Sequence, residues 1–184
     1  MFPDRRARLA LLLPALVLLL AASRAVAQAP PAAEWKVFQE FNFVMGSWSG
    51  PAESAGRIGG RVVTLGSEVD GATLRYRATT YFPAKDDRPE VRTEEIAHIV
   101  YDGGKGKYVA LVIFSTKAWG IYDLDVRPDG SLLFVSRELA NLEAGTRSRW
   151  TISRKADGSL AEQIDVAASG RDFAPYLTAT LSKK

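Results

Sequence analysis

Residues 63–78 read VTLGSEVDGATLRYRA, and this segment carries the strongest signal for the fold. Asp-Gly is a preferred pair at the centre of a two-residue hairpin turn, because both positions need a positive φ. A turn at Asp70-Gly71 places Leu65 opposite Tyr76. The pairs on either side of this one are Gly66 with Arg75 and Thr64 with Arg77. One face of this segment is therefore apolar and the other polar, which predicts a half-buried antiparallel hairpin.

Similar turns recur along the rest of the chain. Asp-Gly pairs also stand at Asp102-Gly103, Asp129-Gly130 and Asp157-Gly158. A three-residue turn ending at Gly130 places Leu124 opposite Phe134. A matching turn ending at Gly158 places Arg149 opposite Asp165, an opposite-charge pair across the strands. Short runs rich in β-branched and aromatic residues separate the turns, which indicates an antiparallel all-β meander.

We predict about ten strands and a short N-terminal helix. The strands cover residues 43–50, 57–68, 72–82, 91–101, 107–115, 118–127, 131–139, 145–154, 159–167 and 173–182. The helix lies within 34–45, where Trp35, Phe38 and Phe41 share one side. Sequential strands joined by short turns can remove both exposed sheet edges by closing into an up-and-down barrel.

Three other architectures fit the pattern less well. A twisted open sheet with one helix leaves two long edges that this short chain hardly covers. An immunoglobulin-type sandwich needs long Greek-key connections, and its usual cysteine pair is missing because the chain has no cysteine. An outer-membrane barrel is opposed by charges in the middle of strands, such as Arg75 and Asp123.

The first 27 residues predict a secretory signal peptide. Arg5, Arg6 and Arg8 precede an apolar run, and Ala25-Val26-Ala27 is a small-x-small cleavage site. Residues 28–33 then form an Ala/Pro linker, and 34–184 form the barrel domain. We expect a periplasmic or secreted protein with no membrane span after cleavage, since the apolar run is too short for one.

Removal of this segment changes the charge balance. Residues 1–27 hold four arginines and one aspartate of the chain's 24 basic and 21 acidic residues, so 20 of each remain. The mature chain then has no net formal charge, and we expect no nucleic acid among its partners. The absence of cysteine also excludes disulfides, thiol nucleophiles and cysteine metal sites.

The segment Phe43-Val44-Met45-Gly46-Ser47-Trp48-Ser49-Gly50 resembles a known pattern. Gly-x-Trp opening the first strand after a short helix is similar to lipocalin-like (calycin) barrels, nearest to nitrobindin-like haem proteins and uncharacterised lipocalin-like exported domains of bacteria. The resemblance implies a ten-stranded barrel with a cavity for a small apolar ligand. The nitrobindin-like branch also implies haem held by a C-terminal histidine, but no histidine follows His98 here.

The strand registers indicate a set of residues facing one interior. The candidate ligand-binding residues are Trp48, Tyr76, His98, Tyr122, Phe134 and Trp150. Trp48 also fits a second role, as a core plug whose indole N–H bonds a carbonyl. No nucleophile–base motif and no metal-spaced cluster is present, so binding without covalent chemistry is favoured over catalysis, with no catalytic residue, metal or cofactor assigned.

His98 supports the alternative reading, a haem-binding or enzymatic barrel. It is the chain's one histidine, and its predicted cross-strand neighbour is Val109 or Leu111, an apolar setting. An imidazole there is either an axial ligand or base, or simply a packed side chain.

Strand 107–115 supports a third reading, a filled barrel that acts through its surface. This strand is apolar on both faces. We expect one face to be interior and the other to be covered by Trp35 and Phe38 of the helix, or by a second subunit in a homodimer.

Overall fold

The computed structural model describes residues 34–184, and residues 37–184 form one compact unit. The predicted signal peptide over 1–27 and the linker over 28–33 lie outside the described residues. Within the described part of the chain, no helix is long and apolar enough to cross a membrane.

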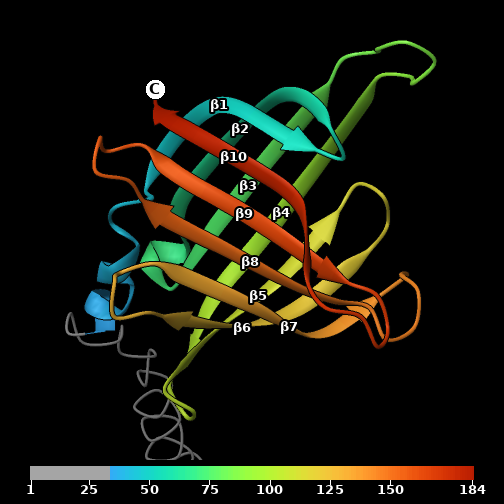
Figure 1. Ribbon diagram of the computed structural model, residues 1–184. Coiled ribbons are helices and arrows are strands. Elements are labelled where there is room, and N and C mark those ends of the chain that lie inside the picture. Colours follow the sequence, from blue (N-terminus) through green and yellow to red (C-terminus); the bar gives the residue numbers. More distant parts are fainter. Residues whose placement is uncertain (1–33) are drawn as a thin grey trace, which may run out of the picture. The chain divides into compact units, whose positions relative to one another are not determined.

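Ten antiparallel strands close into an up-and-down barrel, as predicted. They are β1 (Gly46–Ser54), β2 (Arg57–Glu68), β3 (Thr73–Phe82), β4 (Val91–Asp102), β5 (Lys107–Phe114), β6 (Trp119–Val126), β7 (Leu132–Ala140), β8 (Arg147–Arg154), β9 (Leu160–Ala167) and β10 (Ala174–Lys183). Each strand pairs with the next, and β10 pairs with β1, so the sheet has no free edge (Figure 1). The open-sheet and sandwich alternatives are therefore wrong.

The β2–β3 hairpin has the predicted register. Asp70 and Gly71 adopt φ of 52° and 84°, and the N–H of Ala72 donates to the carbonyl of Val69 at 3.0 Å across them. Leu65 pairs with Tyr76. A two-residue turn that matches the right-handed twist of the strands needs positive φ at both central residues. Asp and Gly both adopt such φ readily, which explains why they stand at these positions.

The hairpins at β6–β7 and β8–β9 also have their predicted registers. Leu124 pairs with Phe134, and Arg149 pairs with Asp165. The side chains of the second pair form an ion pair, with Nε 2.6 Å from Oδ2.

The N-terminal helix differs from the prediction. Glu34–Phe41 is a kinked 3₁₀ segment, η1, and β1 begins at Gly46 and continues to Ser54. Phe38 packs its ring 5.7 Å from those of Phe41 and Tyr108. It therefore does not cover the outer face of β5, where Leu111 and Ile113 remain exposed.

One end of the barrel, which we call the closed end, is tightly packed, with a void of only about 10 Å³ among its core residues. Trp48 is 3% exposed, and its indole N–H donates to the carbonyl of Val44 at 2.8 Å, so the plug reading of this residue holds. The stacked rings of Phe134 and Trp150, with centroids 4.1 Å apart, also fill the interior. Dense packing of this kind leaves no room for a ligand at this end.

Candidate functional site

The other end of the barrel, the open end, contains a cavity of about 440 Å³. It lies where β3, β5, β7 and β9 end, so loops rather than packed side chains surround its mouth. Its walls are mostly apolar and come from several strands and loops: Phe82, Val91, Phe114, Ala118, Leu139, Leu142, Ile164, Val166 and Leu177. A cavity of this size and lining suits a small hydrophobic molecule.

Three polar residues are among the most buried in the lining of this cavity, and we call them its floor. They are Glu95 on β4, Tyr122 on β6 and Ser148 on β8. All three are less than a tenth exposed. Burial raises the pKa of the Tyr122 hydroxyl, a hydrogen bond with Ser148 lowers it, and the charge of Glu95 raises it further. Tyr122 therefore stays protonated at neutral pH and can donate a hydrogen bond.

A buried ionic network separates the floor from the packed closed end. Its centre is Arg61 on β2, whose side chain is 0% exposed. The guanidinium donates to Glu162 at 2.7 Å and 3.1 Å and to Glu95 at 2.7 Å. It also donates to the Tyr76 hydroxyl at 2.8 Å and to the Thr80 hydroxyl. Several such charge-assisted bonds are needed to offset the cost of removing an arginine from water.

Glu162 is the most fully bonded member of this network. Its Oε1 accepts from the Tyr76 hydroxyl at 2.6 Å and from the indole N–H of Trp150 at 2.8 Å, in addition to the bonds from Arg61. Burial raises the pKa of Tyr76 well above its ordinary value, and the positive charge of Arg61 only partly opposes that rise. Tyr76 therefore acts as a donor to Glu162.

Glu95 differs from Glu162 because it is only half bonded. Its Oε1 accepts from Arg61, whereas its Oε2 has no partner among the described residues. The side chain is 9% exposed and lines the cavity. Glu95 thus joins the buried network to the cavity.

Arg57, the one arginine among the cavity residues, lies at the mouth. Its Nη2 donates to the carbonyls of Pro83 at 2.9 Å and Pro89 at 2.8 Å, so it fastens the β3–β4 loop. Its guanidinium also lies 5.7 Å from the ring centroid of Phe82. Nε of Arg57 is buried without a hydrogen-bond partner among the described residues.

The structure separates the six residues predicted to share one ligand site. Tyr122 lines the cavity. Tyr76, Phe134 and Trp150 form a packed aromatic cluster beside it, and Trp48 plugs the closed end. These four fill the barrel instead of lining a cavity large enough for a ligand, because the interior is hollow only at one end.

His98 lies on the outer face of β4. Its strand neighbours Ala97 and Ile99 point inward and are buried, whereas His98 is exposed and pairs across the strands with Leu111 and Arg75. It therefore cannot contact a molecule in the cavity. Within residues 34–184, no group of three histidine or acidic side chains is arranged to hold a metal ion.

Three functional candidates were missed by the sequence reasoning: Arg61, Glu95 and Glu162. The sequence did contain a signal for them, because each charged residue occupies an inward-facing position in the inward–outward alternation of its strand. Arg61 precedes buried Val63 and Leu65 at spacings of two, and Glu95 stands in the same relation to Ala97 and Ile99. A charge on the apolar face of a strand indicates a buried partner or a site.

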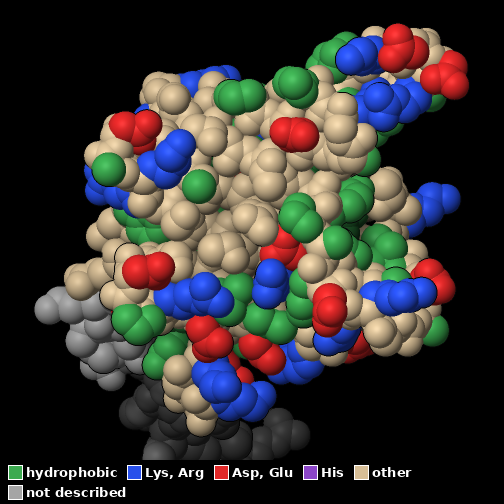
Figure 2. Space-filling view, viewed as in Figure 1, with side chains coloured by type: hydrophobic (Ala, Val, Ile, Leu, Met, Phe, Trp, Pro, Cys, Tyr) green, Lys and Arg blue, Asp and Glu red, His purple; other side chains and the backbone are tan. Residues whose placement is uncertain are grey.

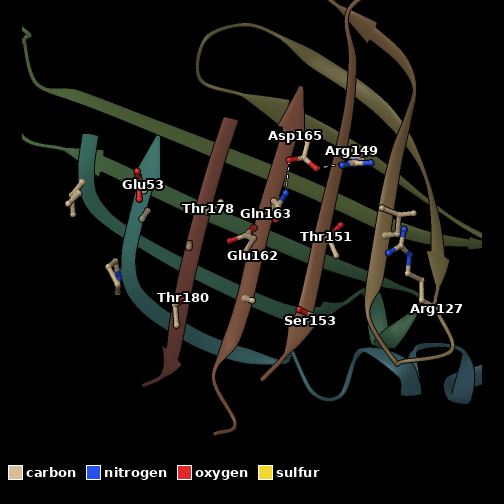
Figure 3. Close-up of a pocket in the computed structure, with 16 residues that line it drawn as sticks. Glu53, Arg127, Arg149, Thr151, Ser153, Glu162, Gln163, Asp165, Thr178 and Thr180 are labelled. Atoms are coloured by element: carbon tan, nitrogen blue, oxygen red, sulfur yellow. Dashed lines mark hydrogen bonds and ion pairs between the residues drawn. The ribbon is translucent and has the colours of Figure 1, made fainter. Parts of the chain in front are cut away.

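An open groove of about 690 Å³ lies outside the barrel over β8–β10 (Figure 3). Outward residues of these strands line it, among them Thr151, Gln163 and Thr178. Asp165, a buried charge beside this groove, accepts hydrogen bonds from Arg149 at 2.6 Å and from Gln163 at 2.7 Å. Basic and acidic side chains are interspersed on this face (Figure 2), so no strong field of one sign marks it.

Comparison with known proteins supports the fold. No family model and no curated protein matches this sequence. Among solved structures, the barrel is similar to the crystal structure of Rv2717c from M. tuberculosis, with a TM-score of 0.56 and 16% sequence identity. The match covers 80% of this chain and 97% of that chain. At this identity the likeness shows the fold alone, a closed antiparallel barrel.

Proposed function

We propose that this protein binds a small hydrophobic molecule in the open-end cavity, without covalent chemistry. The observation that carries the proposal is the cavity of about 440 Å³, walled by apolar side chains in a barrel whose other end is tightly packed. Ligand pockets generally measure roughly 300–1,000 Å³ and combine apolar walls with a few polar groups that orient the ligand. Glu95, Tyr122 and Ser148 supply such groups at the floor.

Burial of the ligand's apolar surface supplies the affinity. Each Å² removed from water contributes about 25 cal/mol before the costs of association are subtracted. A preformed cavity keeps those costs low, because few side chains must be ordered when the ligand enters. The closed barrel keeps the cavity preformed, because the strands that wall the cavity belong to one continuous sheet.

The proposed setting is the periplasm or the outside of the cell. This part of the proposal rests on the signal-like segment 1–27 of the sequence. Its test is the N-terminal sequence of protein recovered from a cell-envelope or culture fraction: a start at Gln28 supports export, and a start at Met1 contradicts it.

Haem held by His98 is not favoured as an alternative. The proposal of haem or catalysis depended on that imidazole reaching the interior, and it lies on the outer face of β4.

A neutral, environment-sensitive dye tests the proposed function. N-phenylnaphthylamine should give a saturable fluorescence rise with one site per chain. Ile164→Trp, which places an indole in the cavity wall, should remove most of that rise. Gln163→Trp is the matched control, since this neighbouring residue on β9 is exposed on the outer face. No saturable binding by the parent protein, or equal loss in both variants, would contradict the proposal.

A further inference from the structure

We infer that the cavity selects ligands with an apolar body and a cationic head, such as protonated alkylamines, through an ion pair with Oε2 of Glu95. The inference rests on the proposed function and names the ligand class for that site. It follows from the half-bonded state of Glu95 and from the charge balance of the network behind it.

The network carries more negative than positive charge. Arg61 contributes one positive charge, and Glu95 and Glu162 contribute two negative charges when both are ionised. Glu162 takes two bonds from Arg61 and one each from Tyr76 and Trp150, so the guanidinium is mainly committed to it. The uncompensated negative charge therefore lies on Glu95, at the cavity floor.

A buried charge without a full set of partners is costly, and a ligand that supplies the missing partner removes that cost. The Glu95 side chain is 9% exposed and lines the cavity, so its open oxygen is reached from the cavity side. An ammonium group placed at the floor would donate to Oε2 of Glu95. It could donate a second hydrogen bond to the hydroxyl oxygen of Tyr122 or Ser148, because these residues line the same floor. The alkyl chain would then lie against the apolar walls.

The positions of the two arginines argue against a fatty-acid-like ligand. Arg61 cannot receive a carboxylate from the cavity, since its side chain is 0% exposed and its donors are occupied by the network. Arg57 has a free Nε, but it lies at the mouth and its Nη2 already holds carbonyl groups of the β3–β4 loop. A carboxylate at the floor would face Glu95 directly, and two like charges at short distance repel.

The test compares three ligands that share one alkyl chain: decylamine, decanol and decanoate. Each displaces N-phenylnaphthylamine from the parent protein near neutral pH, where an alkylamine is protonated. We expect decylamine to bind about ten- to a hundredfold more tightly than decanol, the range of a buried charge-assisted hydrogen bond, and decanoate to bind least. Glu95→Gln should reduce that preference to about threefold or less while decanol binding stays the same.

Glu94→Gln is the matched control. Glu94 is the next residue on β4, points outward and pairs with Arg92 at 2.9 Å, so the same change of charge occurs outside the cavity. This variant should keep the amine preference. Because the comparison among ligands uses the parent protein, it remains decisive even if Glu95→Gln does not fold.

Different failures have different meanings. If decanoate binds as tightly as decylamine, the inference is wrong and Arg57 becomes the candidate for the head group. If the amine preference survives in Glu95→Gln, Glu95 is not its cause and the inference is also wrong. If neither the dye nor any of the three ligands binds, the proposed function fails together with the inference.

Discussion

Arg61 on β2 and Glu162 on β9 are 101 residues apart in the chain, yet Nε of one lies 2.7 Å from Oε2 of the other inside the barrel. Both are essentially inaccessible to solvent. This pair, extended by Glu95, divides a packed half of the barrel from a hollow half. It places charged side chains inside the barrel, next to the floor of the proposed ligand cavity. The stability of the barrel and the binding of a ligand should both depend on these charges.

Arg61→Met should lower the free energy of unfolding by about 3–5 kcal/mol, because it leaves Glu162 and Glu95 buried without their cation. Urea unfolding followed by tryptophan fluorescence measures the change. Arg61→Met with Glu162→Gln should recover at least about 1 kcal/mol, since the amide still accepts from Trp150 and Tyr76 without a buried charge. Equal stability of Arg61→Met and the parent protein would show that the pair contributes no net stabilisation.

Trp48→Phe should lower the free energy of unfolding by about 1–3 kcal/mol. The change removes the indole N–H that donates to the Val44 carbonyl and leaves that carbonyl unpaired at the closed end. Thermal unfolding by circular dichroism measures it. Trp119→Phe, on the outer face of β6, is the control and should change stability by less than about 1 kcal/mol.

Gly59→Ala and Gly60→Ala should behave in opposite ways, although the residues are neighbours on β2. A Cβ at Gly59 would lie 2.0 Å from the carbonyl oxygen of Tyr81, whereas a Cβ at Gly60 meets nothing within 4 Å. Gly59→Ala should therefore cost about 2–3 kcal/mol, and Gly60→Ala should be neutral or stabilising by up to about 0.5 kcal/mol. Urea midpoints compare them directly, and similar values for the two variants would contradict the close packing of β2 on β3.

The free energy of unfolding should fall as the pH rises above about 10. Burial raises the pKa of Tyr76 above its ordinary value of 10.0, so the folded protein keeps a proton that the unfolded chain releases. This contribution is complete below pH 10 and is lost as the pH rises from there toward the folded pKa. Urea unfolding at neutral and alkaline pH tests it. Tyr76→Phe should be less stable at neutral pH and should show a shallower alkaline decline, while an unchanged slope would assign the decline to other groups.

The outer face of β5 leads us to expect concentration-dependent self-association. Leu111 and Ile113 are 41% and 48% exposed on this strand, with exposed Val100 on the neighbouring strand. Leu111→Lys should shift the protein toward the monomer in sedimentation velocity, because a charge in an apolar interface is costly. Val62→Lys is the control, since Val62 is also 41% exposed but lies on β2. A monomer at all concentrations would remove the dimer from consideration.

The hairpins were predictable because their causes are local. Asp70-Gly71 sets a turn whose backbone needs positive φ, and the alternation beside it sets which face is buried. The same reasoning placed Leu124 opposite Phe134 and Arg149 opposite Asp165. The short η1 segment was predicted as a helix, and its 3₁₀ form was not foreseen, since no capping residue marks its start.

The ligand site was less predictable for a different reason. Alternation shows that a side chain points inward, but it does not show whether the interior at that height is filled or hollow. Tyr76, Phe134 and Trp150 point inward as expected and pack against one another, whereas Tyr122 reaches the cavity.

Local chemistry thus accounts for the turns, the strand registers and the inward and outward faces, because each depends on residues a few positions apart. Closure of β10 onto β1 and the meeting of Arg61 with Glu95 and Glu162 depend on strands distant in the chain. Those contacts form only when the whole sheet curves on itself. The tertiary arrangement therefore decides which interior charges are satisfied, which one remains open to a ligand, and where the space for that ligand lies.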